Sequence, residues 1–113
     1  MPISNQHVTA HAFLRGLYED DYYPDHVVDR GKAVLLRLCE NIEADAPVDL
    51  AALYALTRAA TEEFNGLEAE FEAAGSEIET MARDEIARDF WFIARVYGFT
   101  NADMEELIAT REW

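Results

Sequence analysis

Apolar residues recur along most of the chain at the three-to-four-residue spacing of amphipathic helices. No segment shows the sustained apolar–polar alternation of a half-buried strand. This pattern predicts an all-α fold in a single domain, 1–113, with about five helices. The expected ranges are 5–18, 24–44, 50–74, 77–97 and a short helix after an N-terminal box at 100–103. Because the predicted connections are short, successive helices should be antiparallel, and we expect a compact up-and-down bundle.

Several residues mark where these helices begin and end. Asp49 follows a Pro-Val break and is suited to cap the helix that begins at Leu50. Gly75 and Gly98 stand where left-handed residues commonly end helices. Ser76 and Glu79 have the spacing of a capping box, so they predict the start of the fourth helix.

The net charge is the most unusual feature of the amino-acid composition. It has 23 Asp and Glu against nine Lys and Arg, a formal net charge of −14. Nucleic acid and anionic membrane surfaces are therefore poor partners, whereas a basic protein is a suitable one. The alternative is that the acidic residues serve only solubility.

No apolar run approaches the ~18 residues of a membrane span. The single Cys39 and the absence of a leader favour a cytoplasmic location.

Asp89 is the first candidate for chemistry, because its helical position falls in the middle of an apolar arc. A buried carboxylate needs a cation or several hydrogen-bond donors, or else a raised pKa keeps it protonated. Together with Glu79, Arg83 and Glu68 it forms a predicted buried polar site. A structural ion pair would look the same in the sequence, so both interpretations stay open.

Other catalytic signals are weak. His7 and His11 are four residues apart and, with His26, suggest a metal site, although surface histidines give the same spacing. The only serines are Ser4 and Ser76, and no glycine-rich phosphate loop is present. Nucleophilic catalysis is therefore disfavoured, and we expect no cofactor.

Four aromatic residues are candidates for a binding interface, because Tyr and Trp often anchor interfaces: Tyr22, Tyr23, Trp91 and Trp113. Packing within the monomer is the alternative for Trp91. A stripe of small residues on the third helix would permit close approach of another helix and suggests a possible homodimer. It comprises Ala51, Ala55, Ala59, Gly66, Ala69 and Ala73.

Several stretches resemble a small bacterial family of helical proteins of unknown function: LYEDDYYP at 17–24, LYALT at 53–57, ATEEFN at 60–65, SEIET at 76–80 and REW at 111–113. The resemblance covers nearly the whole chain. It implies a cytosolic helical protein and brings no activity, ligand or catalytic residue.

These observations favour a non-catalytic cytosolic interaction or regulatory module with an acidic surface suited to a basic protein. The alternative is an enzyme, or a protein that binds a small ligand or metal, using carboxylates within the helical bundle.

Overall fold

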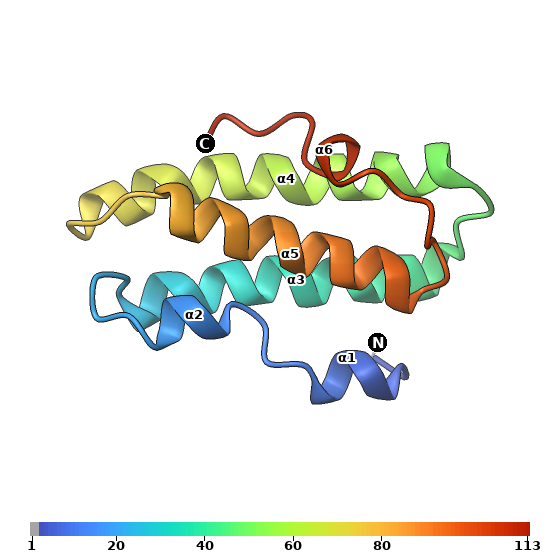
Figure 1. Ribbon diagram of the computed structural model, residues 1–113, viewed down its shortest axis with the longest axis horizontal. Coiled ribbons are helices and arrows are strands. Elements are labelled where there is room, and N and C mark those ends of the chain that lie inside the picture. The colour runs from blue at the N-terminus through green and yellow to red at the C-terminus, as the bar shows by residue number, and fades with distance from the viewer. Residues whose placement is uncertain (1–2) are drawn as a thin grey trace.

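The computed structural model describes residues 3–113, so residues 1 and 2 of the predicted domain lie outside it. The described range contains six helical segments and no strand. Their bounds are α1 Gln6–Ala10, α2 Arg15–Tyr18, α3 Asp25–Asp45, α4 Leu50–Ala73, α5 Thr80–Val96 and α6 Met104–Leu107. The three long helices alternate in direction, with α3 and α5 running one way and α4 the other (Figure 1). The predicted all-α up-and-down bundle is confirmed. None of the helices within residues 3–113 combines the length and the apolar character needed to cross a membrane.

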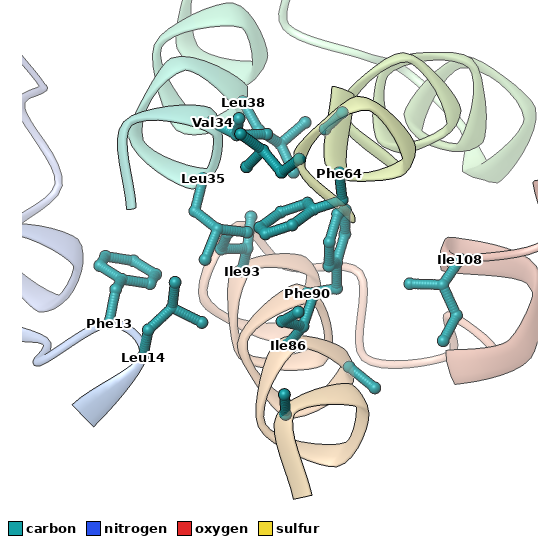
Figure 2. Packing of buried hydrophobic residues seen from close by; sticks show 14 of the residues in the cluster. Phe13, Leu14, Val34, Leu35, Leu38, Phe64, Ile86, Phe90, Ile93 and Ile108 are labelled. Atoms are coloured by element: carbon teal, nitrogen blue, oxygen red, sulfur yellow. The ribbon is translucent and has the colours of Figure 1, made fainter. Parts of the chain in front are cut away.

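The apolar faces of the long helices meet in one core. On α3, the predicted face is buried from Val27 to Ile42, including Gly31. Helix α5 packs against α1, α2, α3 and α6, and Phe90 on α5 lies 5.9 Å from Phe64 on α4 between ring centroids. Figure 2 shows side chains from α3, α4 and the segment before α2 converging on α5. Helix α5, whose wide apolar face predicts a central position, therefore packs against several of the other described helices.

Three predicted helix ends are confirmed. The Asp49 side chain accepts a hydrogen bond from the Ala52 amide at 2.9 Å and caps α4. Gly75 and Gly98 have φ angles of 89° and 92°, in the left-handed region that glycine adopts without a Cβ penalty. They end α4 and α5, respectively.

The predicted capping box at Ser76 is wrong. The Ser76 amide donates to the Phe71 carbonyl at 2.8 Å, which closes the last turn of α4 in a Schellman motif. The Ser76 hydroxyl also donates to the Phe71 carbonyl, at 3.4 Å, so the side chain bonds to α4 and does not cap the next helix. Helix α5 begins at Thr80, with Glu79 in the N-cap position. The box predicted at 100–103 is also displaced, since Asp103 itself caps α6.

The predicted single helix over 5–18 is interrupted. Helices α1 and α2 are separated by residues 11–14, and Leu14 has a left-handed φ of 56°. This break positions the segment that contacts Asp89.

Candidate functional site

Asp89 lies in the middle of α5 and is only 6% exposed. Its Oδ1 is 2.9 Å from Nε2 of His11, and its Oδ2 accepts a hydrogen bond from the Leu14 amide at 2.7 Å. The burial predicted for Asp89 is therefore observed. Its partners are a histidine and a backbone amide, and not one of the arginines that the sequence suggested.

The contact with Leu14 explains how the short helix α2 begins. Leu14 occupies the N-cap position of α2 and provides no side-chain cap. Instead, α5 supplies two carboxylates: Asp89 accepts from Leu14, and Glu85 accepts from the Gly16 amide at 3.0 Å. Amides in the first turn of a helix have no partner within the helix, and negative charge is favourable there. Asp89 and Glu85 therefore cap α2 from a neighbouring helix.

His11 is held between aromatic rings. Its imidazole stacks on Phe92 with a centroid distance of 3.8 Å and meets Phe13 edge-on at 4.5 Å. Burial raises the pKa of the Asp89 carboxyl above its ordinary value, while hydrogen bonds from His11 and Leu14 act in the opposite direction. The pair resembles the Asp–His arrangement of acid–base sites.

The single cysteine does not supply a nucleophile for this pair. Cys39, the only cysteine, is buried, and burial raises the pKa of its thiol to about 12. A thiol with that pKa is almost entirely protonated at neutral pH and is a poor nucleophile. With both Asp89 oxygens already hydrogen-bonded, the arrangement is best suited to fixing residues 11–16 against α5.

The other residues of the predicted polar site have separate surroundings. Glu79 accepts a hydrogen bond from the Tyr22 hydroxyl at 3.3 Å, and the Arg83 Nε donates to the main-chain oxygen of Trp113 at 2.7 Å. Glu68 lies half-buried on α4. Within residues 3–113, none of the three makes a hydrogen bond or an ion pair with Asp89. The structure therefore does not bring the four residues into one site.

The four aromatic interface candidates divide into two groups. Tyr23 and Trp113 are 3% and 6% exposed, and their rings pack against Phe71 and Phe64. Tyr22 and Trp91 are 40% and 39% exposed. The interface prediction does not fit Tyr23 and Trp113, because their rings belong to the core. The small residues of the predicted dimer seam on α4 are exposed, and dimerisation stays a prediction.

The turn before α3 and the turn before α5 lie at the same end of the bundle (Figure 1). Tyr22 belongs to the first of these turns, and its hydroxyl donates to Glu79 of the second. We define the acidic end as this tyrosine together with four exposed carboxylates: Asp20, Asp21, Glu77 and Glu79. Partial desolvation and then the Glu79 carboxylate raise the pKa of Tyr22. Among residues 3–113, no Lys or Arg nitrogen lies within 4.0 Å of these four carboxylates.

Sequence reasoning missed Glu43, which joins three elements. One oxygen accepts from the Ser4 amide and hydroxyl, both at 2.9 Å, and the other accepts from Asn5 and from the Tyr97 hydroxyl. These hydrogen bonds, the one from the Ser4 amide above all, lower the pKa of Glu43 to about 2. Nothing in the local sequence distinguishes this glutamate from its exposed neighbours, since its partners come from elsewhere in the chain.

The suggested metal site is not assembled within the described range. His11 is bonded to Asp89, and the His26 residue is exposed near the start of α3. No group of three His, Cys, Asp or Glu side chains in residues 3–113 is placed to hold a metal ion.

By its fold, the chain is an all-α bundle protein whose conspicuous buried polar group is the His11–Asp89 pair. It belongs to a family of unknown function (DUF5713), which matches residues 7–113. No curated protein and no solved structure matches the chain. The family resemblance predicted from the sequence is therefore confirmed, while a bacterial origin stays a prediction.

Proposed function

We propose that the protein is a non-catalytic cytoplasmic interaction or regulatory module that binds a basic protein through its acidic end. The observation that carries this proposal is the gathering of Asp20, Asp21, Glu77 and Glu79 around the exposed Tyr22, with no Lys or Arg beside them in residues 3–113. The single, buried Cys39 is compatible with a reducing compartment.

The charge of the acidic end favours association with a cationic surface. Carboxylates that no neighbouring Lys or Arg neutralises produce a strong negative field, which steers a basic protein toward this end and raises the association rate. Arginines of the partner can form charge-assisted hydrogen bonds with these carboxylates. Tyr22 provides an amphipathic anchor of the kind enriched at binding hot spots. The same charge opposes nucleic acid and anionic membranes.

The alternative of an enzyme or carrier that uses carboxylates inside the bundle has less support. The one buried carboxylate of the described range, Asp89, uses both oxygens to hold residues 11–14. Glu79 and Arg83 have other partners.

Capture from native lysate tests the proposal if two matched variants are compared with the wild type. The acidic-end variant carries Asp20→Asn, Asp21→Asn, Glu77→Gln and Glu79→Gln. The control removes the same number of charges at exposed carboxylates that form no ion pair in the described range: Asp45→Asn, Glu62→Gln, Asp84→Asn and Glu112→Gln. Both retain side-chain size and hydrogen-bond acceptors.

We expect the wild type and the control variant to capture the same basic protein at low salt, and the acidic-end variant to lose it. Raising the salt to about 0.5 M should release it, because the screening length falls to roughly 4 Å. Equal capture by all three proteins, or a captured partner that is not basic, would show that the acidic end is not the binding surface.

A further inference from the structure

An open cleft lies beside the C-terminal half of α5, the helix against which α1 packs. Its volume is about 420 Å³, within the range typical of small-molecule sites. The cleft is lined by Trp91, Phe92, Arg95 and Val96 of α5, together with His7 and Thr100. Trp91, which is 39% exposed, therefore borders this open cleft.

The lining of this cleft is unusual for so acidic a protein. It contains no Asp or Glu, and its polar side chains all have hydrogen-bond donors: the guanidinium, the imidazole, the indole and the hydroxyl. Four other clefts of the described range have similar volumes, and each includes at least one carboxylate in its lining. Carboxylates number 23 in the chain, so a cleft without one is better suited to an anion than these four are.

Arg95 is the cation that distinguishes the cleft. Its guanidinium lies over the Trp91 ring, 4.6 Å from the centroid, where a cation–π contact favours this position. Among residues 3–113 no carboxylate lies within 4.0 Å of it. Six other arginines of the same range do pair with carboxylates: Arg15, Arg30, Arg37, Arg58, Arg88 and Arg111. Arg95 is thus oriented and retains its donors for another group.

We propose that this cleft binds a small carboxylate that carries an aromatic body. The ligand's carboxylate pairs with the Arg95 guanidinium, whose fork of donors matches a carboxylate in two parallel hydrogen bonds. Its aromatic body lies against the apolar surface of Phe92 and Val96. His7 and Thr100 add donors at the rim.

A monoanion fits better than a phosphate for two reasons. The cleft has one permanent cation, whereas a phosphate dianion generally needs more donors or charges. The net charge of −14 also repels a dianion more strongly than a monoanion. Titration with inorganic phosphate therefore tests whether the cleft prefers a monoanion.

The test is a titration of ¹⁵N-labelled full-length protein with phenylacetate, followed by NMR. Phenylacetamide is the matched neutral probe, acetate lacks the aromatic body, and inorganic phosphate supplies a different anion. We expect phenylacetate to shift the Trp91 indole resonance and amides of residues 91–100, with a Kd of about 1 mM for so few atoms. Each of the other three probes should bind at least about tenfold more weakly.

Two substitutions on α5 complete the test. Arg95→Gln should weaken phenylacetate binding by about tenfold or more, whereas Arg88→Gln, which removes a charge from the same helix, should leave it unchanged. Arg95→Lys keeps the charge but lacks the forked donors of the guanidinium, so its affinity for phenylacetate should lie between those of the other two variants. The proposal is overturned if phenylacetate causes no shifts near Trp91, if phenylacetamide or phosphate binds equally well, or if Arg95→Gln binds as tightly as the wild type. The comparison between probes needs no variant, so it decides the matter even if a substitution destabilises the fold.

Discussion

At the residue scale, the buried carboxylate of Asp89 and the unusual backbone of Leu14 stabilise each other. Burial penalises the carboxylate, and the donors that compensate come from His11 and the Leu14 amide. The Leu14 amide points at Asp89 within a left-handed conformation, which costs a leucine about 1–2 kcal/mol. Burial of the Leu14 side chain, 1% exposed, offsets that cost by a similar amount. The unfavourable backbone and the buried charge are therefore tolerated together.

This account predicts a structural role for Asp89. Asp89→Ala should lower the free energy of unfolding by about 2–4 kcal/mol, because it leaves the Leu14 amide and His11 without their acceptor in a buried position. Asp89→Asn should cost about 1 kcal/mol or less, since the Asn oxygen can still accept from the Leu14 amide, its NH2 group can donate to His11 Nε2 in the other tautomer, and no charge is buried. Urea unfolding followed by circular dichroism measures both values.

The exposed Asp84 on the same helix provides the control, and Asp84→Asn should change stability by no more than about 0.5 kcal/mol. If Asp89→Ala proves as stable as the wild type, Asp89 does not hold the α2 segment. Its conspicuous burial would then need another explanation.

At the element scale, the long helices follow directly from local pattern. The α3 arc from Val27 to Ile42 is buried as its period requires, and the α4 boundaries follow from Asp49 and Gly75. These signals are local: a period, a capping side chain and a residue tolerant of positive φ. Such features are accessible from one sequence.

The elements that sequence reasoning misplaced depend on contacts between distant residues. The break at 11–14 is held by Asp89, 75 residues from Leu14, and no residue near the break signals it. Serine is a residue type that caps helices, but the amide and hydroxyl of Ser76 both donate to the Phe71 carbonyl of α4. The sequence correctly indicates that Asp89 is buried, but it suggests only a metal ligand or a surface residue for His11, which is the partner of Asp89. Periodicity shows which face is buried, but not which distant residue will meet it.

Glu43 offers an element-scale prediction, because it connects the start of α1 and the end of α5 to α3. Its pKa is lowered from 4.5 to about 2 on folding. A group with a lowered folded pKa stabilises the protein above its unfolded pKa, and that contribution is lost as the pH falls toward the folded pKa. The wild type should therefore be more stable than Glu43→Gln at neutral pH, and the difference should shrink between about pH 5 and about pH 2.

Urea midpoints of the two proteins at several pH values measure this difference. Asp45→Asn is a suitable control, because Asp45 is exposed at the same end of α3 and makes no ion pair in residues 3–113. The difference in urea midpoint between Asp45→Asn and the wild type should vary less with pH. A Glu43→Gln difference that stays constant down to about pH 3 would contradict the proposed hydrogen-bonded role.

At the scale of the whole molecule, an apolar core works against a repulsive exterior. The ion pairs of Arg15, Arg37 and Arg58 join side chains that are 45–75% exposed, and such pairs contribute little, typically ~0–1 kcal/mol each. A net charge of −14 meanwhile disfavours the compact state through self-repulsion. Repulsion is expected to outweigh the pairs, since the chain has 23 Asp and Glu and only nine Lys and Arg.

Added salt should therefore stabilise this protein. Raising NaCl from about 20 mM to about 0.5 M shortens the screening length from roughly 20 Å to roughly 4 Å. Repulsion acts over longer distances than the ion pairs do, so it is screened more completely. We expect the melting temperature to rise by about 4–8 °C, which corresponds to about 1 kcal/mol. The acidic-end variant, with four fewer negative charges, should start from a higher melting temperature and gain less. A melting temperature that falls with salt would mean that the surface ion pairs dominate, and that the exterior stabilises the fold instead of opposing it.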